Sequence, residues 1–227
     1  MSKAASFFTA EERQKIEAAV RAAELRTRGE IVPLVVDAAH NYPRAEIQGG
    51  GLLALAIAAN TSWWVSYHGE VLPLALAIGS DWWLHGGPLW IFLVIFLFGY
   101  WPCRLLLRLC PPLLRLLIHP AEIDAEVEER AKVAFLDNNL HRTREGTGIL
   151  ILICLFEHRV QVLADHGIYH AVAPETWQKV ADMVTAGIKQ GRTCDALCEA
   201  VAHCGDLLAE KFPPRADDTD ELPNLIT

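Results

Sequence analysis

The chain has 227 residues, enough for one ordinary domain plus a membrane element and too few for two large domains. Its formal net charge of −8 repels nucleic-acid phosphates, and its Lys and Arg residues form no recognisable nucleic-acid-binding motif. The composition therefore argues against a nucleic-acid partner. Mean hydropathy is only +0.21, because a strongly apolar middle is averaged with two charged ends.

The first soluble stretch, residues 1–45, carries one predicted helix and one predicted strand. Thr9 followed by Glu12 forms a capping box, and Ile16 and Val20 begin an apolar face, so we expect a helix from about residue 10 to 25. The apolar run 31–37 is typical of a buried strand. Pro33 removes one donor from a sheet ladder and places this strand at an edge or at its own start.

Residues 46–119 hold the apolar middle of the chain. An uncharged run of 23 residues, Ile47–Gly69, would span about 34 Å as a helix, against about 30 Å of bilayer hydrocarbon. A second uncharged run of 22 residues, Trp82–Cys103, is more apolar still. Because a small soluble core cannot enclose two such helices on every face, we expect a two-helix transmembrane hairpin rather than two core helices.

The charges around these runs predict the orientation of the hairpin. Arg44 precedes the first run and Arg104, Arg108 and Arg115 follow the second, whereas residues 68–88 contain no Lys or Arg. By the bias of short loops, both termini are expected in the cytoplasm, with the chain crossing the bacterial inner (cell) membrane more than once. Residues 104–115 read as a snorkelling segment at the membrane surface, and residues 71–80 are too short to cross.

The second soluble stretch, residues 120–212, alternates helices and strands. Helical spacing covers 121–139, two apolar strands at 148–155 and 159–164 are joined through residues 156–158, and further helices cover 174–191 and 193–212. Together with residues 1–45 this predicts an α/β fold of the three-layer kind, a small mixed sheet flanked by helices. Residues 213–227 form an acidic tail, expected to be solvated, with cation binding as the alternative.

The cysteines of the last predicted helix allow two interpretations. Cys194 and Cys198 fall on its inward face and are expected to pack as small apolar residues. The alternative is a metal site of Cys194, Cys198, His203 and Cys204, which requires the last two residues to turn back onto the same face.

Topology generates one hypothesis about a chemical site. If strands 31–37 and 148–155 are parallel, with helix 121–139 as their crossover, Glu30 and the loop 141–147 lie at one end of the sheet. The antiparallel strand 159–164 then delivers residues 165–167 to the same end. The candidate cluster has two carboxylates, an arginine and three other polar residues: Glu30, His141, Arg142, Thr143, Asp165 and His166.

Two roles remain open for this cluster. Glu30, Arg142 and Asp165 are candidate catalytic residues, with the arginine binding an anion and the two carboxylates binding a divalent cation. The alternative is structural, with Glu30 and Asp165 forming ion pairs with Arg142 and capping loops. The sequence contains neither a Ser/Cys–His relay nor a phosphate-binding loop.

Three segments carry a family resemblance: RTRGEIVPLVV at 26–36, HRTREGTGILILICLFEHRVQVLADHGI at 141–168, and FPPRADDTDELPN at 212–224. With the apolar hairpin between the first two, the chain resembles the TPM-domain proteins, in particular a bacterial branch of uncharacterised membrane proteins. Relatives in plant thylakoids are described as acid phosphatases or photosystem-repair factors, and an animal relative as a receptor-associated protein.

Two alternative functions are therefore expected. The first is a membrane-anchored interaction or assembly module, facing the cytoplasm, whose partners are the lipid bilayer and another membrane protein. The second is a metal-assisted phosphomonoester hydrolase using Glu30, Asp165 and Arg142.

Overall fold

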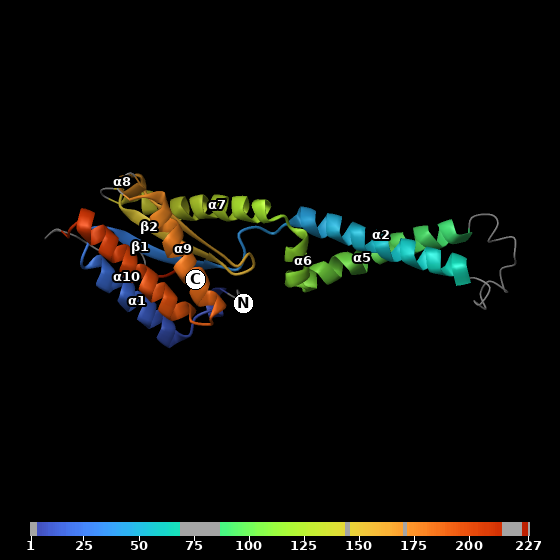
Figure 1. Ribbon diagram of the computed structural model, residues 1–227, viewed down its shortest axis with the longest axis horizontal. Helices are drawn as coiled ribbons and strands as arrows, with labels where there is room; N and C mark the ends of the chain where they lie inside the picture. The colour runs from blue at the N-terminus through green and yellow to red at the C-terminus, as the bar shows by residue number, and fades with distance from the viewer. Residues whose placement is uncertain (1–3, 69–86, 144–145, 170–171, 215–223, 227) are drawn as a thin grey trace. The chain divides into compact units, whose positions relative to one another are not determined.

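The computed structural model describes residues 4–68, 87–143, 146–169, 172–214 and 224–226. The chain divides into two compact units (Figure 1). Unit 1 combines residues 1–40 with residues 120–227, and unit 2 comprises residues 41–119. The second unit is thus inserted in sequence between the first strand and the helix that follows it.

Unit 1 contains the predicted helices and strands with small shifts at their ends. Its main helices are α1 (Ala10–Glu24), α7 (Pro120–Asp137), α9 (Pro174–Lys189) and α10 (Thr193–Lys211). Its strands are β1 (Glu30–Val36), β2 (Gly148–Cys154) and β3 (Arg159–Ala164). Short turns of helix add η1 (Ala4–Ser6), η3 (Leu140–Arg142) and α8 (His166–Tyr169).

The start of α1 confirms the predicted capping box. The Thr9 hydroxyl accepts the Glu12 N–H at 3.2 Å, and the Glu12 carboxylate accepts the Thr9 N–H at 2.8 Å. These reciprocal bonds satisfy two of the donors that a helix start otherwise leaves unpaired.

The sheet has the order β1-β2-β3. β1 and β2 are parallel, with Glu30 opposite Gly148, and β2 and β3 are antiparallel, with Ile149 opposite Ala164. The mixed sheet is therefore confirmed, as is the hairpin between its last two strands. The start of β1, the start of β2 and the end of β3 lie at one end of the sheet.

Helices cover both faces of this sheet, which makes three layers (Figure 1). On one face, Ile31, Ile151 and Val162 belong to a core shared with α1, α9 and α10, which includes Val20, Val180 and Leu197. On the other, α7 contacts β2 and β3 and buries Ile123, Val127, Ala131, Ala134 and Phe135. Because β2 is central, every one of its seven residues is buried.

Pro33 lies on an outer strand, as its missing N–H predicts. The outer side of β1 is bound by the end of the chain itself. Ile226 donates its N–H to the Pro33 carbonyl at 3.0 Å and accepts the Val35 N–H at 3.0 Å, forming a parallel bridge with Leu34. The acidic residues of the predicted tail, Asp217 to Glu221, fall outside the described residues.

Unit 2 consists of α2 (Pro43–His68), α5 (Gly87–Leu109) and α6 (Pro111–Leu117). The helices α2 and α5 run antiparallel and pack along their lengths (Figure 1). Gly50, Ala54 and Ala58 of α2 recur every four residues; a Cβ on Gly50 would lie 3.1 Å from the Arg104 Cβ, and both alanines are buried. A seam of small residues therefore lets two helix backbones approach closely.

Only one helix among the described residues is long and apolar enough to cross a membrane by composition, the segment Leu89–Leu109 of α5. The first predicted span forms helix α2, but Asn60, Thr61 and Ser62 lower its hydropathy. The prediction of two apolar spans was thus met in part, by one apolar helix packed against a second, less apolar one. Residues 71–80, Trp82 and Trp83 lie outside the described residues.

Candidate functional site

The predicted cluster lies at the end of the sheet where β1 and β2 begin. The register places Glu30 beside Gly148, and Asp165 follows β3 and donates its N–H to the Gly148 carbonyl at 2.9 Å. Glu30, Gly148 and Asp165 thus form one row across the sheet. Since neighbouring strands are about 4.8 Å apart, the backbones of the two carboxylate residues are separated by about 10 Å.

Leu140 lies over the middle of this row. A Cβ on Gly148 would stand 2.7 Å from the Leu140 carbonyl oxygen and 3.2 Å from its Cβ, and Leu140 is fully buried. An apolar residue therefore occupies the space over Gly148, between Glu30 and Asp165. The two residues share an end of the sheet, as predicted, without forming an open polar cluster there.

Asp165 has a visible structural role. One carboxylate oxygen accepts the His166 N–H at 2.6 Å, and its carbonyl accepts the N–H groups of Ile168 and Tyr169 at 3.0 and 2.9 Å. These contacts cap the short helix α8. The other oxygen, Oδ2, is buried without a hydrogen-bond partner in the described part of the chain and faces Gly146.

Arg142 is exposed at the end of η3, and its N–H donates to the Asn139 carbonyl at 2.8 Å. Within the described residues it forms no ion pair with either Glu30 or Asp165. Of the structural alternative, the ion pairs with Arg142 are therefore not found among the described residues, whereas the capping role of Asp165 is present. Sequence order brought the loop to the correct end of the sheet but did not reveal that Leu140 points inward and Arg142 outward.

The threonines of the two sequence motifs hold loops together. The Thr147 hydroxyl donates to the Arg28 carbonyl at 3.1 Å, and the Thr27 hydroxyl donates to the Phe212 carbonyl at 2.9 Å. Thr143, a member of the predicted cluster, accepts the Thr147 N–H at 3.0 Å through its own buried hydroxyl. Thr27 and Thr147 thus join loops that are distant in sequence, and Thr143 closes its own loop. His141 and His166 are exposed.

The arrangement does not fit a divalent cation. In the described ranges there is no group of three or more His, Cys, Asp or Glu side chains placed to hold a metal. Among the described residues, Glu30 Oε2 and Asp165 Oδ2 are both buried without a hydrogen-bond partner, but Leu140 packs over Gly148 between these two residues, so their carboxylates are not brought together around one point. No chemical step through a metal is therefore derived for this site.

The cysteine cluster is a packing feature. Cys204 is fully buried, and Cys194 and Cys198 lie against the carbonyls of Glu12 and Lys15 on α1. Burial raises the pKa of Cys204 to about 12 and that of Cys198 to about 11. A raised pKa keeps these thiols protonated at neutral pH, whereas metal binding requires the thiolate.

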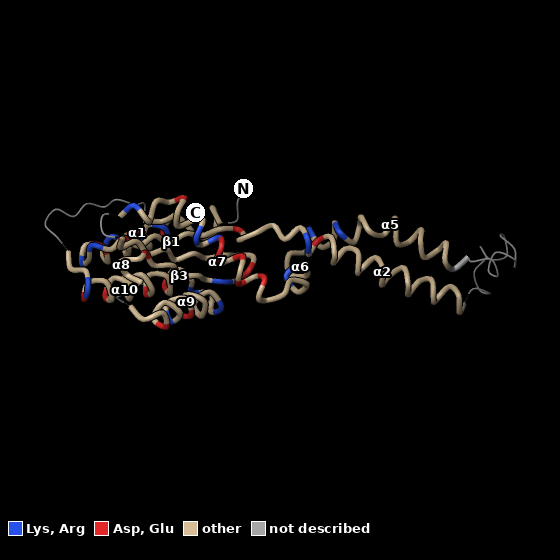
Figure 2. The backbone as a smooth tube through the Cα atoms, turned by 90° about the horizontal axis from the view of Figure 1, so that it is seen from above, with Lys and Arg blue, Asp and Glu red and all other residues tan. Residues whose placement is uncertain are grey.

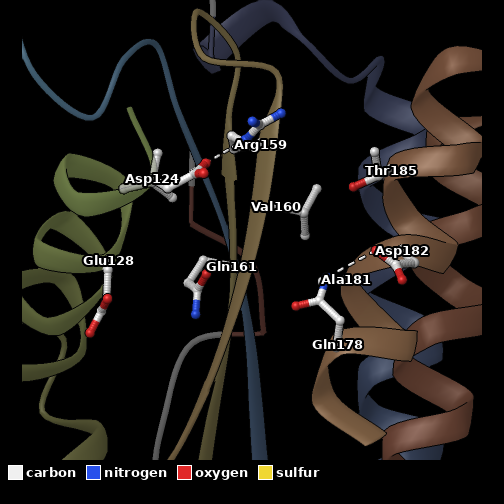
Figure 3. Close-up of a pocket in the computed structure, with 10 residues that line it drawn as sticks. Asp124, Glu128, Arg159, Val160, Gln161, Gln178, Ala181, Asp182 and Thr185 are labelled. Carbon is white, nitrogen blue, oxygen red and sulfur yellow. Dashed lines mark hydrogen bonds and ion pairs between the residues drawn. The ribbon is translucent and has the colours of Figure 1, made fainter. Parts of the chain in front are cut away.

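A groove that no sequence pattern predicted runs along the outer edge of β3. Helices α7 and α9 form its two walls and β3 its floor (Figure 3). One part has a cavity volume of about 410 Å³ between Asp124, Arg159 and Asp182, and an adjoining part of about 250 Å³ continues past Leu163 to Trp177. The groove exists only because residues 124–128, 159–164 and 177–185 are assembled by the fold.

Comparison with known proteins shows the fold. No family model and no curated protein matches the chain. A solved structure, the NMR structure of BA42 protein from the psychrophilic bacterium Bizionia argentinensis sp. nov., is similar with a TM-score of 0.55 and 21% identity, over 97% of this chain and 94% of that one. At this identity the likeness concerns the fold alone.

Proposed function

We propose that this protein is a membrane-anchored interaction module of the TPM-domain type, with unit 2 as the anchor and unit 1 as a binding domain in the cytoplasm. The family assignment rests on the three sequence segments that resemble TPM-domain proteins. The proposed partners are the lipid bilayer and another membrane protein. A catalytic role is not included, because the described residues of the predicted cluster do not bring reactive groups together at one point.

The observation that carries the anchor is the outer surface of unit 2. Small and half-buried residues line the seam between α2 and α5, while large apolar side chains point away from it. Only 6% of the most apolar window of α5 is buried. The exposed residues include Leu52, Leu55, Ile57, Trp63, Trp64, Leu93, Val94, Leu97, Phe98, Trp101, Leu105 and Leu106. This arrangement is costly in water and favourable in lipid.

The charges of unit 2 support the same proposal. The described charged residues of this unit are Arg44, Glu46, Arg104, Arg108 and Arg115, and Figure 2 shows them near α6, at one end of the α2–α5 pair. Both helices are otherwise free of Lys, Arg, Asp and Glu over their described residues. Although α2 is less apolar than α5, its polar residues Asn60 and Thr61 carry no charge, and the Thr61 hydroxyl is bonded to the Ile57 carbonyl at 2.6 Å. We therefore assign both helices to the bilayer.

Alkaline carbonate extraction of cell membranes tests the anchor. The full chain should remain in the membrane pellet and be released by detergent. Replacing Leu97 and Phe98 by lysine should shift it toward the soluble or aggregated fraction, since each charge at a helix centre costs about 3 kcal/mol of insertion. Lysines at Val133 and Leu136, exposed on α7 of unit 1, provide the matched control and should leave the pellet fraction unchanged. Release of the unaltered chain by carbonate would refute the anchor.

Reporter fusions test the orientation. A reporter that works only in the cytoplasm should be active after Thr227, and one that works only outside should be active when placed within residues 68–88. The opposite pattern would show that the Lys/Arg asymmetry around unit 2 does not determine its topology.

A further inference from the structure

The two edge strands of the sheet in unit 1 differ in whether their outer backbone groups are paired. The outer side of β1 is paired with Ile226, through two backbone hydrogen bonds of 3.0 Å. β3 forms the opposite edge, and in the described part of the chain no strand pairs with its outer side. The domain thus carries one edge already extended by its own terminus and one edge that remains open.

The ladder shows which groups of β3 face outward. Asp165 donates to the Gly148 carbonyl, so alternate residues back along the strand, Leu163, Gln161 and Arg159, turn their backbone groups toward β2. Val160, Val162 and Ala164 therefore direct their N–H and C=O groups into the groove. In the described part of the chain, the Gln161 side-chain amide donates to the Val162 carbonyl at a long distance of 3.5 Å.

β3 lacks the features that usually block an exposed edge. Its sequence, RVQVLA, contains no proline and no lysine, and its register with β2 is continuous over six residues, without a bulge. Its single charge, Arg159, is engaged by Asp124 at 2.8 Å. Natural edge strands are normally shielded by such devices, so an unshielded one at the floor of a groove is suited to pairing.

The walls of the groove define the charge of a suitable partner. Asp124 and Glu128 lie on α7 and Asp182 lies on α9, so carboxylates flank the floor from both sides (Figure 3). Arg159 is the one cation among the residues that line the described groove. Asp124 is paired with Arg159 at 2.8 Å and Glu128 with Lys132 of the same helix at 2.6 Å, and both pairs are exposed to solvent. The lining still has three carboxylates against one arginine, and this net negative charge favours a strand with lysine or arginine side chains directed toward the two walls.

A second copy of this chain fits less well. Antiparallel pairing of two β3 edges about a two-fold axis keeps each face of the sheet on its own side, so Glu128 of one copy would approach α7 of the other. Acidic walls would then oppose acidic walls. The same repulsion is absent for a basic peptide.

We propose that the open edge of β3 binds an extended basic peptide segment of a partner protein by strand addition, with Asp124, Glu128 and Asp182 contacting its cationic side chains. This inference names the binding surface of the interaction module and therefore rests on the proposed function. The backbone of β3 supplies affinity, and the carboxylate walls supply selectivity.

The test uses the full chain in detergent micelles and, as the probe, a fluorescent octapeptide in which pairs of lysines alternate with pairs of valines, so that lysines point toward both walls. Binding is followed by fluorescence anisotropy, with a glutamate-for-lysine peptide and a fully N-methylated lysine peptide as controls. The lysine peptide should bind, whereas both controls should bind at least about tenfold more weakly, because one is repelled and the other lacks backbone donors.

Variants of the protein locate the binding. Replacing both Glu128 and Asp182 by lysine should weaken binding of the lysine peptide by about tenfold or more. Glu210→Lys combined with Glu199→Lys changes the net charge equally on α10 and should leave the affinity unchanged. Residue-resolved amide exchange should slow at Val160, Val162 and Ala164 on binding, and change little at Gln161 and Leu163, whose amides already face β2.

Three outcomes would overturn the inference: equal binding of the N-methylated peptide, unchanged exchange at Val160 to Ala164, or a dimer of the free chain that protects the same amides. The carbonate extraction is independent of all three. A chain that stays in the membrane but does not bind the peptide would refute strand addition alone, whereas a chain released by carbonate would refute the anchored module.

Discussion

Gly148 is packed directly beneath Leu140, such that a Cβ at position 148 would lie 2.7 Å from the Leu140 carbonyl oxygen. The neighbouring atom belongs to the backbone, so a side chain cannot be accommodated by rotating a flexible group. Gly148→Ala should therefore destabilise unit 1 by about 1–3 kcal/mol, as an overpacked core residue does. Chemical denaturation followed by circular dichroism would measure the loss.

Gly51→Ala is the control for this substitution. No heavy atom lies within 4 Å of its Cβ position, and alanine is the better helix former, so its unfolding free energy should be unchanged or slightly higher. A Gly148→Ala protein as stable as the unaltered chain would mean that η3 can move away from the sheet.

Glu30 and Asp165 are expected to be structural residues. Asp165→Ala removes the cap of α8 and should cost about 1 kcal/mol, whereas Asp165→Asn keeps an acceptor and should cost less. Glu30→Gln alters a buried carboxylate and should also lower stability. Arg142→Ala should have little effect, since Arg142 is exposed and pairs with neither carboxylate.

Hydrolysis of p-nitrophenyl phosphate, with and without Mg²⁺ or Ca²⁺, distinguishes this role from catalysis. The purified chain should show no activity above background under either condition. Measurable hydrolysis that disappears in Glu30→Gln or Asp165→Asn, at an unchanged melting temperature, would instead establish the metal-assisted phosphatase that the sequence also suggested.

The buried thiols should be chemically inert in the folded protein. Burial raises the pKa of both Cys154 and Cys204 to about 12, from an ordinary value of 9.0, so the reactive thiolate is scarce near pH 8. Alkylation by iodoacetamide, followed by peptide mass spectrometry, should label Cys154, Cys198 and Cys204 slowly in the native chain and rapidly in guanidinium chloride. Fast native labelling of Cys204 would show that α10 opens readily.

The raised pKa values of Cys154 and Cys204 should make the free energy of unfolding fall as the pH becomes alkaline. Because the folded pKa is raised, the unfolded chain loses its thiol protons first, and the favourable contribution present below pH 9 is lost as pH rises toward 12. Cys204→Ala should reduce the slope of unfolding free energy against pH in this window, although it also removes packing. Equal slopes for the two proteins would mean that the thiol ionises at its ordinary pKa.

Close packing of α2 and α5 should depend on Gly50. Its Cβ position lies 3.1 Å from the Arg104 Cβ and 3.2 Å from the Arg104 Cα, so Gly50→Leu must separate the helices. The loss should reach about 1–3 kcal/mol and weaken the Glu46–Arg104 ion pair, whose charged atoms are 3.9 Å apart. Gly51→Leu, with open space around it, is the matched control.

Thermal unfolding in detergent would compare the two leucine variants. The melting temperature should fall for Gly50→Leu and stay near that of the unaltered chain for Gly51→Leu. Similar behaviour of the two would indicate that α2 rotates to avoid the clash.

Local patterns in the sequence predicted most elements of unit 1. The Thr9–Glu12 capping box, the apolar β2 run and the alternation in β3 are properties of neighbouring residues, and each gave the correct element. Parallel pairing of β1 and β2, the condition on which the site hypothesis depended, is found in the structure. The sequence was less informative where contacts join distant segments.

The candidate site shows this limit clearly. The position of Leu140 over Gly148 and the pairing of Ile226 with β1 depend on how loops fold back, and neither has a periodic signal. Topology therefore placed Glu30 and Asp165 at the correct end of the sheet, while Leu140 prevents them from meeting. The groove along β3 was missed for the same reason, because three separate segments build it.

The hydrogen bond from Ala39 to the Glu157 carboxylate joins residues 118 positions apart, and the bond from Thr147 to Arg28 joins residues 119 apart. Every partner of β1 within its sheet is thus synthesised after unit 2. During translation β1 therefore remains unpaired until the inserted helices and the later strands have left the ribosome. Completion of unit 1 is consequently a late event, and arrest of unit 2 at any stage would leave an apolar strand available to chaperones or to aggregation.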